Sequence, residues 1–336
     1  MSKFPLDVLE KRVFPYTRSE DPDVVLGSVF GEDVSLTRIG GELLVSHVDP
    51  IVGAIGNIGW LAVHVSCNDV ATAGVPPRWL LLLVLVPSRE DEELLEQIMS
   101  DASRAAQEIG VSVIGGHTGY SAGLSRPLVA VTALGTSDGR RVVRTAGAHT
   151  GDIVLVTKGV ALEGTAILAQ DFADVALSLG LAETDLAEAS QLVKDVSVVP
   201  EALAVASAGA SAMHDVTRGG LLETLLEMAR LSDVCLEIDP TLIPRRPVVT
   251  RFAEAFQFDP LRMISSGTLA VTVPPERTQH VSQSLEALGT PFAFVGQVTS
   301  GRGVRLLGDE RTAHYTEIRC EDDELARMWA LYPRGE

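Results

Sequence analysis

The chain alternates strand-like and helix-like segments along its whole length, in two halves of similar size. In the first half, residues 79–86 form a short run of leucine and valine that is typical of a buried strand, and residues 90–109 carry apolar side chains at helical spacing. A polar stretch containing several glycines, residues 137–152, separates the halves. This pattern predicts an α+β protein of two domains, residues 1–145 and 146–336, instead of one doubly wound sheet.

The same periodicities predict the remaining elements of both halves. Further strands are expected over residues 43–48, 111–114, 128–134, 153–157, 234–238, 268–273 and 292–298. Further helices are expected over residues 57–73, 163–170, 177–192, 221–231, 275–288 and 322–331, with one more after Pro200.

Composition restricts the class of protein and its partners. The formal net charge is -18, so we expect no affinity for nucleic acid or for an anionic membrane, and a phosphate ligand would need metal ions to neutralise it. The three cysteines, at positions 67, 235 and 320, form no CxxC pair, which argues against a disulfide framework and a zinc site. No signal peptide and no apolar run of about 20 residues is visible, so a cytoplasmic location is expected.

Residues 214–220, His-Asp-Val-Thr-Arg-Gly-Gly, concentrate chemistry directly before a predicted amphipathic helix. A carboxylate, a hydroxyl and a guanidinium fall within four residues, and two glycines then let backbone approach a ligand. The start of a helix attracts anions, so the segment suits a phosphate with a cation on its carboxylate. An ordinary helix cap followed by a turn is the alternative. The candidate binding residues here are Asp215, Thr217, Arg218, Gly219 and Gly220.

Acidic residues at three further places could complete an oxygen-ligand set for Mg²⁺. Asp33 lies in a loop, Asp49 ends a predicted strand, and Asp69 follows Asn68 inside an apolar helix, where an aspartate is disfavoured unless it is paired or bound to metal. With Asp215 they form the candidate metal ligands. For each of them taken singly, a helix cap or a local salt bridge is the alternative.

Two glycine-containing segments that follow predicted strands could hold phosphates. Gly115, Gly116, His117 and Thr118 come after the strand over residues 111–114, although a hairpin turn is also common there. Lys158 follows the first predicted strand of the second half, residues 153–157, and could place its ammonium on a polyphosphate. The chain has no Walker A spacing.

Histidine and cysteine offer a second kind of site. Histidines 47, 64, 117 and 214 lie near these segments, so a transition-metal site is conceivable, but no pair has i,i+4 spacing. Cys67 could be a nucleophile, although a small buried residue is the usual role of a free cysteine.

Together these segments resemble the AIR synthase superfamily, which includes aminoimidazole ribonucleotide synthase, the hydrogenase maturation protein HypE, selenophosphate synthetase and thiamine-monophosphate kinase. The resemblance covers about residues 31–298, and the segment at 214–221 is most similar to the Asp-Pro-Thr-Arg-Gly-Gly-Leu of HypE. The matching segments, in the family's order, are residues 31–33, 48–49, 56–74, 115–118, 214–221 and 266–276.

The resemblance implies an N-terminal α/β domain whose sheet pairs with that of a second subunit in a barrel-like arrangement, and a C-terminal α/β sandwich domain. It implies binding of ATP and Mg²⁺ and transfer of phosphate to an amide-type or other small-molecule oxygen. The implied metal ligands are Asp33, Asp49, Asp69 and Asp215. The implied catalytic residues are Asp69, Asp215, Arg218 and Lys158, and the implied cofactor-binding residues are Asn68, Gly115, Gly116, His117, Thr118, Thr217, Gly219 and Gly220.

Two departures from this family distinguish the chain. His117 stands where the family has an acidic residue. HypE carries its substrate on a C-terminal cysteine, whereas this sequence ends Pro-Arg-Gly-Glu and Cys320 lies further back. We therefore consider an ATP-dependent synthase or kinase first and a nucleotide-binding assembly factor without turnover second. A divergent aminoimidazole ribonucleotide synthase is the third hypothesis, disfavoured by the Thr217-Arg218 pair.

Overall fold

The computed structural model describes residues 4–52, 57–308, 312–319 and 323–333, so Gly56, Cys320 and the last three residues lie outside the described part. The chain divides into two compact units. The smaller unit comprises residues 19–28 and 33–142, and the larger unit comprises residues 1–18, 29–32 and 143–336.

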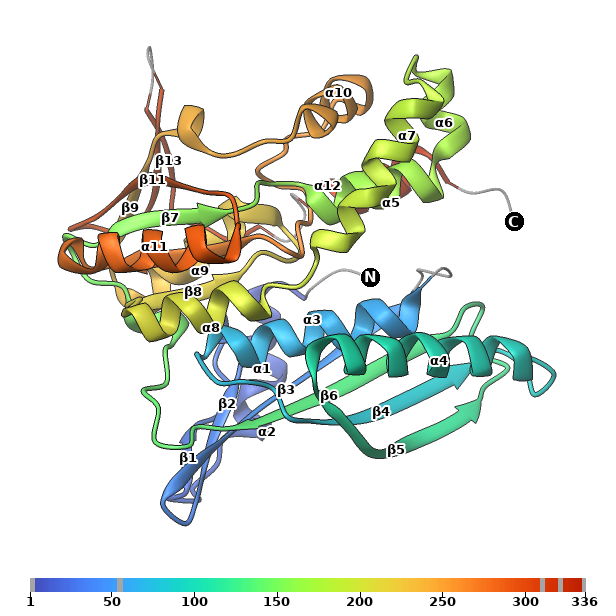
Figure 1. Cartoon of the computed structure of the whole chain (residues 1–336), viewed down its shortest axis with the longest axis horizontal. Coiled ribbons are helices and arrows are strands. Elements are labelled where there is room, and N and C mark those ends of the chain that lie inside the picture. The colour runs from blue at the N-terminus through green and yellow to red at the C-terminus, as the bar shows by residue number, and fades with distance from the viewer. Residues whose placement is uncertain (1–3, 53–56, 309–311, 320–322, 334–336) are drawn as a thin grey trace. The chain divides into compact units, whose positions relative to one another are not determined.

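The smaller unit is a six-stranded mixed sheet in the order β1-β2-β3-β6-β4-β5, coloured blue to green in Figure 1. Only β4 and β5 run parallel among its neighbouring strands, and in the described residues the sheet does not close into a barrel. Its strands are β1 (Val24–Leu26), β2 (Ser35–Ile39), β3 (Glu42–Val52), β4 (Trp79–Val86), β5 (Ser112–Tyr120) and β6 (Leu128–Thr136).

Two helices cover one face of this sheet, α3 (Ile58–Thr72) and α4 (Glu92–Ile109). Helix α3 packs across β3 and β6 and against α4, so its side chains are buried nearly all round. Such a helix is apolar on every face, and polar side chains within it need partners. The buried polar side chains of α3 are His64, Ser66, Asn68, Asp69 and Thr72, and Asp69 is the only carboxylate among them.

The other face of the smaller unit's sheet is apolar and exposed. Leu81 is 39% exposed between the buried Leu80 and Leu82, and Val48 on β3 is 60% exposed. Strand side chains alternate between faces, so both of these point away from α3 and α4. An exposed apolar sheet face of this kind is typical of an interaction surface.

The larger unit contains a seven-stranded mixed sheet in the order β13-β12-β9-β11-β7-β10-β8. Strands β9 and β12 are parallel, and the other neighbours are antiparallel. The strands are β7 (Ile153–Thr157), β8 (Ala212–Asp215), β9 (Cys235–Ile238), β10 (Leu269–Val273), β11 (Phe292–Thr299), β12 (Gly303–Leu307) and β13 (Thr312–Tyr315).

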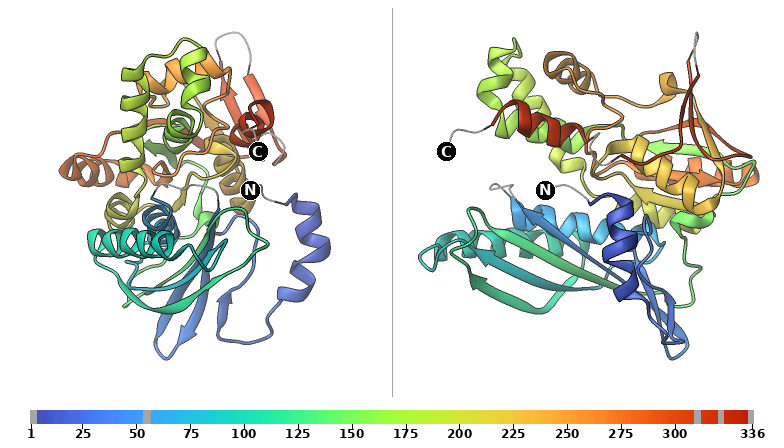
Figure 2. Two further views of the ribbon diagram at one scale, coloured as in Figure 1. Left: turned by 90° about the vertical axis from the view of Figure 1, so that its right-hand side faces the viewer. Right: turned by 180° about the vertical axis from the view of Figure 1, so that it is seen from behind.

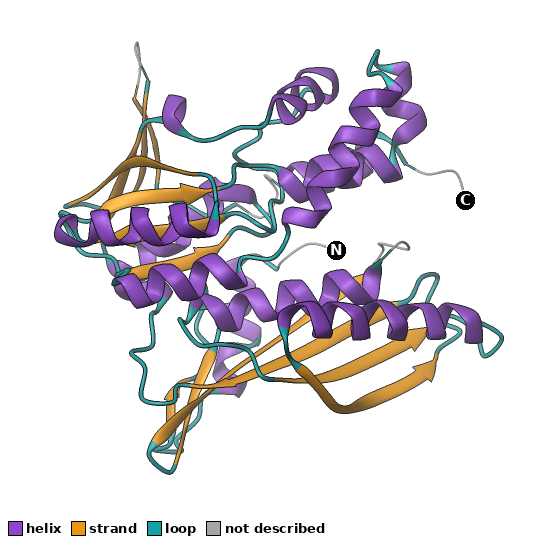
Figure 3. Cartoon of the chain, viewed as in Figure 1, coloured by secondary structure: helices purple, strands orange, loops and turns teal. Residues whose placement is uncertain are grey.

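Helices pack on both faces of this second sheet (Figures 2 and 3). Helix α9 (Gly220–Ser232) lies on one face, while α8 (Val199–Ala208) and α11 (Thr278–Leu288) pack together on the other. Phe252 and Phe256 anchor a separate helical core. The remaining helices are α1 (Leu6–Arg12), α2 (Phe14–Thr17), α5 (Leu162–Asp171), α6 (Ala173–Ser178), α7 (Glu183–Ser190), α10 (Pro247–Phe256) and α12 (Glu324–Leu331).

The predicted α+β class is confirmed, and most predicted elements appear within a few residues of their expected bounds. The strand predicted to end at residue 114 was wrong, because β5 continues through the glycines to Tyr120. The helical stretch predicted over residues 177–192 is broken at Gly180. No helix in the described ranges is long and apolar enough to span a membrane.

Candidate functional site

Asp33 and Asp69 of the smaller unit share a hydroxyl neighbour. The Thr72 Oγ1 atom lies 3.1 Å from Asp33 Oδ2 and 2.6 Å from the backbone oxygen of Asp69. Asp69 is only 6% exposed, so helix α3 buries a carboxylate among apolar side chains. Because burying a carboxylate is unfavourable without compensation, this position is under a constraint other than packing.

Strand β3 adds two polar side chains to the face that α3 covers. His47 and Asp49 lie two residues apart, on the same side of the strand as the buried Val45. The Nδ1 atom of His47 contacts the backbone oxygen of Asp33, and its Nε2 atom lies 3.4 Å from Asp69 Oδ2. The structure thus places His47 beside Asp33 and Asp69. His47 was not among the metal ligands predicted from the sequence.

Two α3 residues next to Asp69 are fully enclosed. Asn68 and Cys67 have no exposed surface. Burial, with a smaller contribution from the charge of Asp69, strongly raises the pKa of the Cys67 thiol. Since the thiolate is the nucleophile, Cys67 is an unreactive core residue.

The Gly115–Thr118 segment lies within the edge strand β5, where its side chains are exposed. Gly116 has φ +148°, and a Cβ atom there would lie 1.9 Å from the Leu82 backbone oxygen. Strand pairing with β4 therefore requires glycine at this position whether or not a ligand binds. Phosphate binding by His117 and Thr118 stays a prediction.

Asp215 ends β8 in the larger unit and is fully buried. Neither of its carboxylate oxygens has a hydrogen-bond partner among the described residues, and His214 Nδ1 is 3.7 Å away. The Nε2 atom of the same histidine lies 2.9 Å from Glu227 Oε2 on α9. A buried carboxylate without hydrogen bonds is costly, and a bound cation would remove that cost.

The loop after Asp215 is fixed by a side chain from the far end of the chain. Arg218 Nη1 donates to Asp323 Oδ2 at 2.9 Å, and Asp323 also caps helix α12. Gly220 has φ +68°, and a Cβ atom there would lie 2.5 Å from the Leu261 backbone oxygen. The Thr217–Gly220 turn is therefore held closely against its surroundings, and its role in nucleotide binding remains a prediction.

Glu163, in the first turn of α5, is a buried carboxyl that sequence reasoning missed. Burial raises its pKa, against the opposing effects of hydrogen bonds from Ser266 and of the Arg218 charge, and the negative charge of Asp215 raises it further. Glu163 therefore belongs to the same electrostatic group as Asp215. The sequence signal that could have identified Glu163 was a glutamate in the first turn of an otherwise apolar helix.

Lys158 makes contacts that bear on its predicted role. Its Nζ atom lies 2.6 Å from Glu201 Oε1 and donates to the backbone oxygens of Asp195 and Ser197. The Lys158 backbone has φ +57°, which is uncommon for a residue with a side chain. A phosphate bound by this ammonium would have to compete with Glu201, which is 2% exposed.

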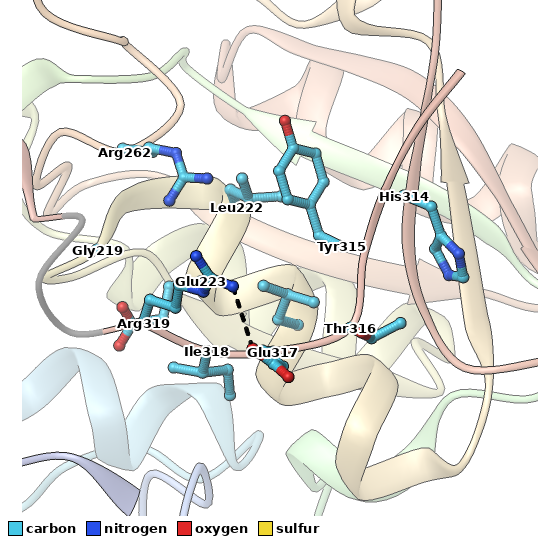
Figure 4. A pocket seen from close by; sticks show the side chains of 11 residues that line it. Gly219, Leu222, Glu223, Arg262, His314, Tyr315, Thr316, Glu317, Ile318 and Arg319 are labelled. Carbon is cyan, nitrogen blue, oxygen red and sulfur yellow. Dashed lines mark hydrogen bonds and ion pairs between the residues drawn. The ribbon is translucent and has the colours of Figure 1, made fainter. Parts of the chain in front are cut away.

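A pocket of about 350 Å³ opens at the start of α9 in the larger unit. Figure 4 shows Arg262 and Tyr315 on one side of it and Arg319 with Glu317 on the other. The Arg262 guanidinium lies 5.5 Å from the centre of the Tyr315 ring. Leu222 on α9 contributes apolar surface, while Glu223 and Glu317 contribute carboxylates, so the pocket has apolar walls and side chains of both charges.

Two family models match the chain and together span most of it. The model of the AIR synthase related protein, N-terminal domain, matches residues 31–137, and the corresponding C-terminal domain matches residues 149–309.

Curated relatives and solved structures agree with these matches. Carbamoyl dehydratase HypE of Rhodobacter capsulatus is 31% identical over 262 residues, 76% of this chain and 73% of that protein. The HypE of Rhizobium leguminosarum bv. viciae is 29% identical over 286 residues, 80% of this chain and 77% of the relative.

Three solved structures share the fold. A HypE–HypF complex gives a TM-score of 0.74 at 21% identity, covering 93% of this chain and 99% of that one. A HypE in complex with ATP gives a TM-score of 0.67 at 24% identity, covering 82% of this chain and 85% of that one. ThiL complexed with AMPPCP and TMP gives a TM-score of 0.68 at 20% identity, covering 82% of this chain and 87% of that one.

Proposed function

The chain belongs to the AIR synthase-related family, and we propose that it is an enzyme that uses ATP with Mg²⁺ to transfer phosphate to an oxygen of an amide-type or other small molecule. Relatives named HypE and ThiL have been solved with ATP and with AMPPCP, which supports a nucleotide in this chain as well. A phosphorylated oxygen is a good leaving group, so such a transfer activates the acceptor for a second step.

Asp215 is the observation that carries this proposal. Its carboxylate is fully buried and lacks hydrogen bonds in the described structure, an arrangement that suits a divalent cation. In the smaller unit, Asp33, Asp49 and Asp69 present oxygen donors of the type that Mg²⁺ prefers. Bound Mg²⁺ would neutralise the phosphate charge that a chain of net charge -18 otherwise repels.

The remaining predicted residues would position the reactants. We assign Asn68 and Thr118 to phosphate orientation, Arg218 and Lys158 to transition-state charge, and Thr217, Gly219 and Gly220 to close approach of the nucleotide. Gly115, Gly116 and His117 would form a further part of the cofactor site. For phosphoryl transfer, positioning and charge stabilisation account for most of the catalysis a protein can supply.

The pocket at the start of α9 is our candidate for the acceptor. The Arg262 guanidinium suits a carboxylate or carbonyl oxygen, and Leu222 suits an apolar part of the same molecule, whereas Arg319 is paired with Glu317 at 3.3 Å. These walls favour a small polar acceptor over a large apolar one.

Calorimetric titration with ATP, with and without Mg²⁺, tests the nucleotide proposal. We expect binding that depends on Mg²⁺ and that falls at least ~10-fold in Asp69→Ala, because a charged ligand is lost. Asp101→Asn is the matched control, since Asp101 is also a buried aspartate of the smaller unit but pairs with Arg104 on α4. Absence of ATP binding, or equal binding in the wild type and Asp69→Ala, contradicts the proposal.

A nucleotide-binding maturation factor without turnover is the second candidate. His117 in place of the family's acidic residue favours it, and a HypE relative has been solved in complex with HypF. Phosphate release in the presence of amide and alcohol acceptors separates the two, because sustained turnover is expected only of the enzyme. A divergent aminoimidazole ribonucleotide synthase is a third candidate, which the same assay addresses with that enzyme's acceptor.

We also propose a homodimer that forms through the exposed sheet face of the smaller unit. Val48 and Leu81 would become buried in it, so Leu81→Lys should convert the dimer to a monomer by placing a charge in an apolar interface. Size-exclusion chromatography with light scattering measures this at micromolar concentration. A wild-type monomer contradicts the proposal, and Lys11→Leu, on an exposed position of α1, serves as the control.

A further inference from the structure

The ring of His47 is held in one orientation by its Nδ1 atom. Nδ1 contacts the backbone oxygen of Asp33, and a carbonyl oxygen only accepts hydrogen bonds, so Nδ1 must carry the proton. In the neutral imidazole this leaves an electron pair on Nε2. Histidines that bind metals commonly donate their other ring N–H to a backbone carbonyl in this way.

The Nε2 atom of His47 faces a second electron-pair donor. It is a buried atom with no hydrogen-bond partner among the described residues, and it lies 3.4 Å from Asp69 Oδ2. Two such atoms repel each other unless a cation or a proton lies between them. Two ligands that each lie about 2.1 Å from one ion are about 3.0 Å apart at an octahedral angle and about 3.4 Å apart at a tetrahedral one, so the observed separation is at the upper end of this range.

Two further carboxylates, Asp33 and Asp49, lie on segments next to this pair in the smaller unit. Thr72 Oγ1 joins Asp33 Oδ2 to the Asp69 segment, and Asp49 lies on the same side of β3 as His47. The candidate ligand pair is therefore mixed, with one imidazole nitrogen and one carboxylate oxygen. Imidazole suits first-row transition ions, whereas Mg²⁺ is bound mainly by oxygen.

We propose that His47 Nε2 and Asp69 Oδ2 ligate one divalent cation, and that this site therefore selects a transition ion such as Mn²⁺ or Co²⁺ over Mg²⁺. The inference rests on the proposed nucleotide- and cation-dependent function and specifies which metal serves it. A proton shared in a His47–Asp69 ion pair is the competing explanation, and it predicts no metal selectivity from His47.

The first test measures binding of Mn²⁺ and Mg²⁺ to the full chain with ATP present. Wild type is expected to bind Mn²⁺ at least ~100-fold more tightly than Mg²⁺. His47→Asn keeps an N–H for the Asp33 carbonyl but removes the ring nitrogen, so it should reduce that ratio at least ~10-fold, because Mn²⁺ binding weakens more than Mg²⁺ binding. His149→Asn, at a histidine 76% exposed in the larger unit, should leave the ratio unchanged.

A second test first examines the wild type, so its main outcome does not depend on the folding of His47→Asn. Pulsed electron paramagnetic resonance of Mn²⁺ bound to wild type should show coupling to a ¹⁴N nucleus, and loss of that coupling in His47→Asn would assign it. Absence of ¹⁴N coupling in wild type, or an unchanged Mn²⁺ to Mg²⁺ ratio in His47→Asn, overturns the inference while leaving Mg²⁺-dependent ATP binding intact. Failure of wild type to bind ATP with either ion instead overturns the proposed function.

Discussion

Asp215→Asn is expected to weaken cation-dependent ATP binding at least ~100-fold and, at the same time, to raise the melting temperature of the metal-free protein. The carboxylate of Asp215 is fully buried without a hydrogen bond in the described structure, so its charge destabilises the fold whenever no cation is bound. A neutral amide of the same shape removes roughly 1 kcal/mol of that penalty, equivalent to a few degrees in melting temperature. Thermal unfolding in EDTA, and again with Mg²⁺ and ATP, measures both effects.

Asp152→Asn provides the control for Asp215→Asn. Asp152 is also a buried aspartate of the larger unit, but its Oδ2 atom accepts hydrogen bonds from Ser211 Oγ at 2.5 Å and from the His149 backbone N–H at 2.9 Å. Asn at position 152 should therefore lower the melting temperature and leave the effect of Mg²⁺ with ATP unchanged. A lower melting temperature of Asp215→Asn in EDTA would show that its carboxylate is stabilised by something other than a cation.

Lys158→Met is expected to lower the free energy of unfolding by about 3–5 kcal/mol, because it leaves the Glu201 carboxylate buried without its ion partner. Burial raises the pKa of Glu201, and the Lys158 charge opposes that rise. In the variant the folded-state pKa of Glu201 rises further above its unfolded-state value, so Glu201 holds a proton in the folded protein that it releases in the unfolded chain. Stability should then fall as pH increases above about 4.5, the ordinary glutamate value. Urea denaturation between pH 5 and 8 measures this slope.

A double variant separates the structural role of Lys158 from its proposed catalytic role. Lys158→Met with Glu201→Met replaces the buried pair by apolar side chains and should recover most of the lost stability. If the Lys158 ammonium also contacts phosphate, the stable double variant still loses ATP turnover. Arg302→Met is the control, because the Arg302–Asp233 pair is exposed on both sides and should change stability by less than about 1 kcal/mol. A similar small loss in Lys158→Met would contradict the buried-pair interpretation.

Local patterns in the sequence were sufficient to predict many of the elements. The strand β4 matches its predicted bounds of residues 79–86, since a run of apolar β-formers specifies a buried strand directly. Helix α3 lies within the predicted 57–73 because Gly74 ends its pattern. The order of short acidic and glycine motifs similarly identified the family, which two family models then matched.

Partners far apart in the sequence could not be predicted in this way. Glu227 beside His214, and Asp323 beside Arg218, are brought together only by the packing of α9 and α12. The strand predicted over residues 111–114 ended too early because glycine usually ends a strand. In β5, Gly116 is instead required where its backbone lies against Leu82. The role of His47 depends on two contacts, one from a loop and one from a helix, that no local spacing encodes.

The connectivity of the two units sets the order in which the chain can fold during synthesis. Glu10 on α1 pairs with Arg230 at 3.5 Å, and Gly31 packs against Glu227. These two N-terminal segments can therefore form their native contacts only after some 200 further residues have been synthesised. The segments of the smaller unit are all complete by residue 142, so this unit can fold while the ribosome is still translating the rest. Until the second half has been synthesised, the first helix lacks the native neighbour that Arg230 provides. A fragment starting at residue 143 would lack these two segments and expose the surface that they cover.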